Sequence, residues 1–106
     1  MGQKSLGGDD LSKLRAAYTQ KVHCELPAAA DPEWPIHQDH CFARVVLDNL
    51  FQDRWDTHVS GRPAYEHLSP TELREAIRLA DRMLDTGTPG VKKLNNNSLR
   101  WRDERR

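Results

Sequence analysis

Long apolar runs, cysteines and an N-terminal signal are scarce or missing in this chain of 106 residues. No run approaches the roughly 18 apolar residues that a transmembrane helix needs, which excludes a membrane-spanning protein of that kind. Residues 1–4 lead into no apolar stretch, so we expect no secretory signal peptide. The two cysteines, Cys24 and Cys41, are too few for a disulfide-stapled secreted scaffold. We therefore expect a cytoplasmic protein, in a reducing compartment, with both thiols free.

An excess of charge of one sign is also missing, because 16 Lys and Arg residues face 16 Asp and Glu residues. A balanced chain lacks the overall attraction that draws basic proteins to nucleic acid. Lipidation is not expected either: an N-myristoylation signal needs Ser or Thr at the position of Leu6, and Ser5 comes one residue early. What is present, a length typical of one small domain and 37% hydrophobic residues, allows a modest core.

A first helix is predicted after residues 1–8, which are small, polar and expected to be flexible. Asp9 or Asp10 can cap it, since a carboxylate accepts hydrogen bonds from the free N–H groups of the first turn. Its apolar face repeats at helical spacing through Leu11, Leu14, Tyr18 and Val22. We expect this helix to end before Pro27, and the proline-rich residues 26–36 to form a connector that Trp34 anchors on the core.

A second helix is predicted over residues 40–52, with Asp39 as its cap. Apolar side chains surround most of this helix, which is typical of a central, buried one. They are Phe42, Val45, Val46, Leu47, Leu50 and Phe51. The loop that follows is expected to turn at residues 61–63.

The third predicted helix begins with a capping box, residues 69–72, which has proline at the first helical position. Gly87 is its predicted stop, and its buried stripe comprises Leu73, Ile77, Ala80 and Leu84. A fourth, shorter helix begins at Thr88, and one of its faces carries Val91, Leu94, Ser98 and Trp101. Asparagine favours caps and turns, so residues 95–97 are expected to break this helix, and residues 102–106 to fray.

These segments predict an all-α fold, with one domain at residues 9–101 and about four helices joined by connectors rich in proline and glycine. The second helix should be central, with the others packed around it. The expected core comprises Leu14, Tyr18, Phe42, Val46, Leu50, Leu73, Ile77, Leu84 and Leu94.

Histidines and cysteines gather in two short stretches, His23-Cys24 and residues 37–41. Zinc takes four tetrahedral ligands from such side chains, so His37, His40 and Cys41 are candidate ligands together with the earlier pair. The spacing matches no common zinc finger, however, and neighbouring residues on a helix point about 100° apart. Loop histidines and a buried thiol, without metal, are the simpler interpretation.

Cys41 also has the pattern of a candidate nucleophile. It falls in the first turn of the predicted second helix, where the helix dipole stabilises a thiolate, and His40 or His67 could act as its base. A free cysteine is nevertheless among the most buried residue types, and no oxyanion-hole loop is identifiable. A core thiol is therefore the preferred interpretation.

A basic ridge on the third helix consists of Arg74, Arg78 and Arg82, spaced four residues apart. Residues 92–106 add six basic and two acidic side chains around Trp101, a pattern that suits a phosphate backbone. Acidic residues at pairing distance favour instead a solvated helix face, and they are Glu75, Asp81 and Asp85.

Side chains with candidate binding roles gather in the loop after the second helix, and they are Trp55, His58, Arg62 and Tyr65. Asp48 and Asn49, on the preceding helix, are polar residues on an otherwise apolar surface, and a buried polar group needs partners. His58, Arg62 and the Tyr65 hydroxyl are the predicted partners. They would form either a structural network that pins the loop to the helix, which is the preferred interpretation, or a ligand-binding site.

Several short motifs lie between residues 35 and 101: His40-Cys41-Phe42, Leu47-Asp48-Asn49, Arg62-Pro63-Ala64-Tyr65, Leu68-Ser69, Leu94-Asn95 and Ser98-Leu99-Arg100. Together they resemble a family of small helical proteins from microbes and fungi, some of which are labelled GNAT-related N-acetyltransferases. That label implies acetyl transfer with acetyl-CoA as cofactor. The sequence departs from it, because GNAT domains hold acetyl-CoA with an Arg/Gln-x-x-Gly-x-Gly/Ala loop, and Gly7-Gly8 lacks the preceding basic residue and the glycine spacing.

For each candidate catalytic pattern, a structural role of the same residues is the preferred interpretation. The preferred function is therefore a small non-enzymatic protein-interaction module or a subunit of a larger assembly. One alternative is a transferase, either the acetyltransferase that the label implies or an enzyme dependent on Cys41. A second alternative is a nucleic-acid binder that uses the arginine ridge and the basic C-terminus. Zinc and acetyl-CoA belong only to the less favoured alternatives.

Overall fold

Every regular element is helical in the computed structural model, which describes residues 7–104. The longer helices are α1 (Gly7–Thr19), α3 (Asp39–Phe51), α4 (Pro70–Thr86) and α5 (Thr88–Glu104). The shorter ones are η1 (Gln20–Glu25), α2 (Leu26–Ala29), η2 (Trp55–Thr57) and η3 (Ala64–His67). Because α1, η1 and α2 follow one another without a break, the predicted all-α fold of about four helices is confirmed. No helix in this part of the chain combines the length and the hydropathy that crossing a membrane requires.

The first helix begins earlier and ends later than predicted. It starts at Gly7, so Asp9 and Asp10 lie inside it rather than capping it. It continues through Pro27 because η1 is a π-helix, in which the N–H of Leu26 donates to the carbonyl of Lys21, five residues back. Pro27 then falls in the first turn of the resumed α-helix, where the N–H that proline lacks has no helical partner. The expectations about residues 1–6, flexibility and no lipidation, lie outside the described residues.

The connector and the start of α3 depend on two anchors. Trp34 is buried, with its ring edge-on to Phe42 at 5.9 Å between centroids, so the predicted anchor is confirmed. The N-cap of α3 is Gln38 in extended conformation, and Asp39 lies within the first turn, so the predicted cap was one residue late. Asp39 still accepts a hydrogen bond from the backbone N–H of His40, at 2.8 Å.

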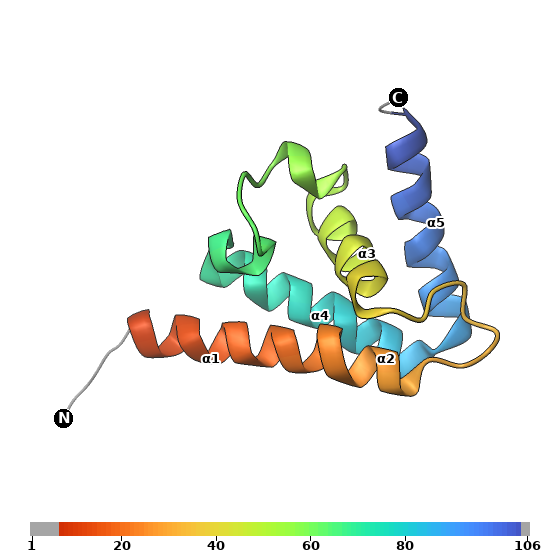
Figure 1. Cartoon of the computed structure of the whole chain (residues 1–106), viewed down its shortest axis with the longest axis horizontal. Helices are drawn as coiled ribbons and strands as arrows, with labels where there is room; N and C mark the ends of the chain where they lie inside the picture. The colour runs from red at the N-terminus through yellow and green to blue at the C-terminus, as the bar shows by residue number, and fades with distance from the viewer. Residues whose placement is uncertain (1–6, 105–106) are drawn as a thin grey trace.

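α3 is the central helix, as predicted. It packs against α5, α4 and η1, and its buried residues are Phe42, Val45, Val46, Leu47 and Asp48. Figure 1 shows α1, η1 and α2 as one long rod with α4 running beside it, while α3 and α5 rise away from this pair. The loop after α3 returns over one side of the molecule, and it meets α1 through η3.

The capping box of α4 is confirmed in both directions. Ser69 Oγ accepts a hydrogen bond from the N–H of Glu72 at 3.1 Å, and Glu72 Oε1 accepts one from the N–H of Ser69 at 2.8 Å. Gly87 ends the helix with φ of 67°, a left-handed conformation that glycine adopts without a steric cost. These local rules therefore determine both ends of α4.

The core includes five of the predicted residues, which are Tyr18, Phe42, Val46, Leu73 and Leu94. The other four, Leu14, Leu50, Ile77 and Leu84, are only partly buried. On α4 the fully buried face runs through Leu73, Ala76, Ala80 and Met83, because its two alanines let neighbouring helices approach closely. The predicted stripe shares Leu73 and Ala80 with this face, but it has the partly buried Ile77 and Leu84 in place of Ala76 and Met83.

α5 is longer and more regular than predicted. Residues 95–97 do not break it, and two of their side chains have partners on α3: Asn95 accepts a hydrogen bond from Arg44, and Asn97 donates one to Asn49. Arg102, which was expected to fray, lies inside the helix and donates two hydrogen bonds to Asp48. Residues 105 and 106 are not among those described.

Candidate functional site

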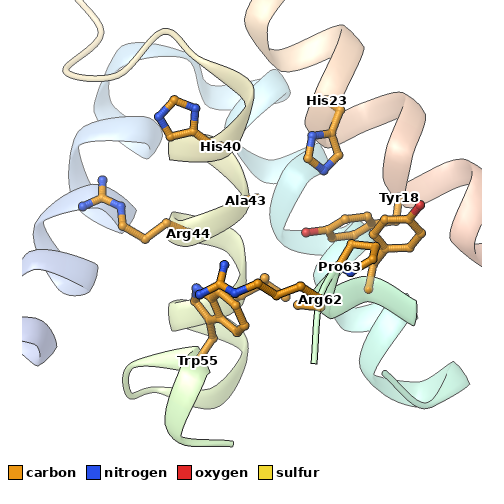
Figure 2. A pocket seen from close by; sticks show the side chains of 11 residues that line it. Tyr18, His23, His40, Ala43, Arg44, Trp55, Arg62 and Pro63 are labelled. Atoms are coloured by element: carbon orange, nitrogen blue, oxygen red, sulfur yellow. The ribbon is translucent and has the colours of Figure 1, made fainter. Parts of the chain in front are cut away.

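A hollow of about 180 Å³ lies between the long N-terminal helix, α3 and the loop that carries η2 and η3 (Figure 2). Its walls are mainly apolar and aromatic. The lining residues are Tyr18, His23, His40, Ala43, Arg44, Leu47, Trp55, Arg62, Pro63, Ala64 and Tyr65. Three of the predicted binding residues, Trp55, Arg62 and Tyr65, therefore meet at one place; we call it the aromatic hollow.

Aromatic contacts hold the walls of this hollow. Tyr65 stacks on Tyr18 with ring centroids 5.6 Å apart and an angle of 26° between the planes. Burial, and secondarily the nearby Tyr65, raise the pKa of the Tyr18 hydroxyl well above its ordinary value, so this side chain stays neutral. His23 lies edge-on to Tyr18 at 5.9 Å. These ring contacts fix the wall of the hollow that lies on the α1 side.

A second, more open hollow of about 570 Å³ adjoins the first and shares His40, Arg44, Trp55 and Arg62 with it. Its remaining lining residues are Cys41, Arg54, Asp56 and Arg102. We call it the arginine hollow, because four of its lining side chains are guanidinium groups. An apolar cavity therefore opens directly onto a cluster of positive charge.

Two of these four arginines are already paired with carboxylates. Arg54 donates from Nε and Nη2 to Asp56, at 3.3 and 3.0 Å. Arg102 donates from Nε to Asp48 at 2.7 Å. Their charges are thus compensated within the protein.

The other two, Arg44 and Arg62, have no carboxylate partner among the side chains that the structure describes, those of residues 10–103. Arg44 reaches from α3 toward α5, where Nη2 donates to the neutral amide of Asn95 at 2.6 Å, and its buried Nε has no partner. Burial lowers the pKa of Arg44, although a guanidinium stays charged at neutral pH. Arg62 lies over the ring of Trp55, 5.1 Å from the ring centroid, as Figure 2 shows. Both uncompensated charges lie on the wall that the two hollows share.

Asp48 is fully buried and satisfied, but not by the predicted partners. It accepts hydrogen bonds from Ser98 Oγ at 2.6 Å and from the backbone N–H of Trp55 at 2.9 Å, in addition to those from Arg102. The sequence pointed to the loop side chains because residues 102–106 were expected to fray, and α5 instead supplies the donors. The contact with Trp55 does fix the start of η2 to α3.

Asn49 and the remaining loop residues also have other partners than expected. Asn49 Nδ2 donates to the carbonyls of Val45 and Leu94, at 2.8 and 2.9 Å, so Asn49 ties α3 to α5. His58 stacks on Phe51 at 4.9 Å and lies 3.1 Å from Asp53. Neither Asn49 nor His58 lines the aromatic hollow.

Cys41 lies in the first turn of α3, as predicted, and it is half-buried. No hydrogen bond joins its thiol to His40 or to His67 in the described part of the chain, so neither histidine is placed as a base. The ring of His67 lies instead against Gly61, which has a φ of 149° and no room for a side chain. The nucleophile interpretation has no supporting contact.

The five candidate zinc ligands do not converge. Among the side chains of residues 10–103, which the structure describes, no three His, Cys, Asp or Glu residues are arranged to hold a metal ion. Cys24 is exposed, and the ring of His37 bonds the carbonyl of Asp31 at 3.0 Å. His23 Nδ1 lies 3.0 Å from Asp39, and this hydrogen bond lowers the pKa of the Asp39 carboxyl. The geometry therefore gives no support to a zinc site at these residues.

The arginine ridge of α4 is exposed, as predicted, and Arg78 pairs with Glu75 at 2.7 Å. Arg82 also borders a polar hollow of about 370 Å³ between α3, α4 and α5. Lys93 and Trp101 line the same hollow, together with amide side chains. The ridge is thus a solvated face that meets the other basic residues only at Arg82.

Sequence reasoning missed Arg44, Arg54 and Arg102 as members of the site. The sequence position of Arg44 could have indicated a site residue, since it is the one charged residue between Phe42 and Leu47 in an otherwise apolar stretch. Comparisons of the chain with protein-family models, with curated proteins and with solved structures found no match. The geometry of the two hollows is therefore the basis for a functional proposal.

Proposed function

We propose that this protein is a small non-enzymatic interaction module. Its binding face is the aromatic hollow together with the shared wall of Arg44 and Arg62. The occupant is a segment of a partner protein with one large apolar side chain next to an acidic one. The observation that carries this proposal is the pair of uncompensated guanidinium groups at the mouth of an apolar cavity.

The size of the aromatic hollow supports a side chain as its occupant. Pockets that bury a drug-sized ligand or a cofactor enclose about 300–1,000 Å³. The aromatic hollow has about 180 Å³, which suits one large side chain of a partner. Interfaces commonly derive most of their binding energy from such an anchor seated in a pocket with a polar rim.

The chemistry of the wall supports an acidic neighbour to the anchor. A guanidinium binds a carboxylate through parallel hydrogen bonds that are stronger than neutral ones. Arg62 has its N–H donors free of carboxylates within the described chain, and Arg44 uses one nitrogen on a neutral amide. Binding an acidic group would therefore supply a counter-charge that these two arginines lack in the described chain.

The walls are held in place before any partner arrives. The bond from the Trp55 N–H to Asp48 fixes one wall to α3, and the stack of Tyr65 on Tyr18 fixes another to α1. A preorganised site loses less conformational entropy on binding. Catalysis has less support, since the histidines and Cys41 at the hollows form no nucleophile–base pair.

A panel of three peptides tests the proposal by calorimetry or fluorescence anisotropy. The first has a central Phe between pairs of Glu, the second replaces every Glu by Gln, and the third replaces Phe by Ala. We expect the first peptide to bind at least about tenfold more tightly than either of the others, because each loses one of two required contacts. Equal binding of all three, or no binding, would contradict the proposal.

Two variants with matched controls locate the binding on the protein. Ala43→Leu fills the aromatic hollow from α3, and Ala16→Leu makes the same change on the exposed face of α1. Arg62→Ala removes a wall charge, and Arg74→Ala removes an exposed charge from α4. The variants at the hollows should weaken the first peptide about tenfold or more, and the controls should leave its affinity unchanged.

A further inference from the structure

We infer that the anionic group on the partner is a phosphoryl dianion carried by the anchoring ring itself, so that the preferred occupant is a phosphorylated aromatic side chain. This inference rests on the proposed function. It commits to one arrangement, with the ring in the aromatic hollow and the phosphoryl group in the arginine hollow.

The balance of charge in the arginine hollow carries the inference. Its lining includes Arg44, Arg54, Arg62 and Arg102. Asp56 compensates Arg54, and the buried Asp48 compensates Arg102. Two positive charges remain, on Arg44 and Arg62. A single carboxylate would leave one of them uncompensated, whereas a phosphoryl group brings about −1.5 to −2 at neutral pH.

The hydrogen-bonding capacity of the wall points the same way. A phosphoryl group presents three acceptor oxygens, and clusters of arginine are a recurring way to recognise it. Among the described side chains and backbone, Arg44 has one acceptor, the amide of Asn95, and a buried N–H without any. Arg62 contacts the ring of Trp55 and has no acceptor in the same described part of the chain. The wall therefore has more donors than a carboxylate can use.

The placement of the two hollows fits a group attached to a ring. They share four lining residues, His40, Arg44, Trp55 and Arg62, so a ligand that extends from the aromatic hollow into the arginine hollow meets both residues that carry the uncompensated charges. Trp55, Tyr18 and Tyr65 line the aromatic hollow, and aromatic pairs favour offset or edge-on ring contacts. His40 is mostly exposed at this boundary and can donate a further hydrogen bond.

The test compares peptides that differ only in the substituent on a central tyrosine: the hydroxyl, a sulfate ester and a phosphate ester. Sulfate and phosphate esters have nearly the same shape, but sulfate carries one negative charge and phosphate about two at neutral pH. We expect phosphotyrosine peptide to bind about tenfold more tightly than sulfotyrosine peptide, and both more tightly than the tyrosine peptide. Arg62→Ala should reduce the advantage of phosphate over sulfate, whereas Arg74→Ala should keep it.

Three results would overturn the inference. Equal affinity for the phosphate and sulfate esters would show that the wall recognises a single charge, and the proposed function would stand if the Glu-flanked Phe peptide still binds. Phenyl phosphate alone binding as tightly as the phosphotyrosine peptide would show that the ligand is a small molecule rather than a partner segment. If neither these tyrosine peptides nor the Glu-flanked Phe peptide binds, both the inference and the proposed function fail. Unchanged thermal unfolding of Arg62→Ala is the control for folding.

Discussion

Arg102, in the last turn of α5, donates two hydrogen bonds to the fully buried carboxylate of Asp48 in α3, at 2.7 and 3.2 Å. The same carboxylate accepts from the backbone N–H of Trp55, where the loop that forms the hollows begins. One side chain thus joins the C-terminal helix, the central helix and the binding loop. Its role is to hold the walls of the candidate site rather than to contact a ligand.

Removing this carboxylate should destabilise the fold. Asp48→Ala leaves Arg102 without its counter-charge and Ser98 without its acceptor, and breaking a buried ion pair from one side costs about 3–5 kcal/mol. Since Arg102 is partly exposed, we expect the lower end of that range in urea denaturation. Asp56→Asn, which breaks an exposed pair, should cost about 1 kcal/mol or less. An unchanged unfolding midpoint for Asp48→Ala would contradict the structural role.

Two core positions on α4 should differ in their contribution to stability. Leu73 is fully buried, so Leu73→Ala should cost about 2–5 kcal/mol through lost burial and the cavity left behind. Ile77 is only partly buried, so Ile77→Ala should cost clearly less in the same denaturation experiment. Equal losses at the two positions would mean that the buried face of α4 is centred between them.

The carboxyl of Asp39 should titrate at an unusually low pH. Its hydrogen bond from His23 lowers its pKa, so the ionised form is favoured in the folded protein. The resulting contribution to stability is fully present above the ordinary pKa of aspartate, about 3.9, and is lost as the pH falls through the lowered folded pKa. NMR titration of the Asp39 carboxyl carbon should show this low midpoint.

Two histidine variants distinguish the cause of that shift. His23→Ala removes the hydrogen bond, so the midpoint of Asp39 should rise toward the ordinary value. His37→Ala is the matched control, because its ring bonds the carbonyl of Asp31 instead. If the midpoint of Asp39 is the same in His23→Ala as in the parent protein, the hydrogen bond is not the cause.

Local rules in the sequence were sufficient to predict both ends of α4. They were not sufficient where a helix depends on an unusual hydrogen-bond register or on contacts with another helix. The capping box at Ser69 and the stop at Gly87 depend only on neighbouring residues, and both were predictable. The continuation through Pro27 was not, because it requires a π turn whose hydrogen-bond register no simple periodicity reveals. Similarly, residues 95–97 favour turns by themselves, but they are helical in the folded protein, where Asn95 and Asn97 bond to side chains of α3.

The candidate site was predictable in part. Trp55, Arg62 and Tyr65 were expected to gather because loops bring polar and aromatic side chains together, and the structure places all three at the aromatic hollow. The side-chain partners of Asp48 were not predictable, since they come from α5, about 50 residues away in the sequence. The meeting of Arg44 with Arg62 depends on the packing of a loop against α3, which single-sequence patterns do not encode.

The most direct test of the central claim is to map where the Glu-flanked Phe peptide binds, by titrating it into the ¹⁵N-labelled protein and following amide chemical shifts. The largest changes should cluster around Tyr18, Ala43, Arg44, Arg62 and Tyr65, and they should vanish in Ala43→Leu but persist in Ala16→Leu. Changes centred on the arginine ridge of α4, or no saturable changes at all, would contradict the claim that the aromatic hollow is the binding site.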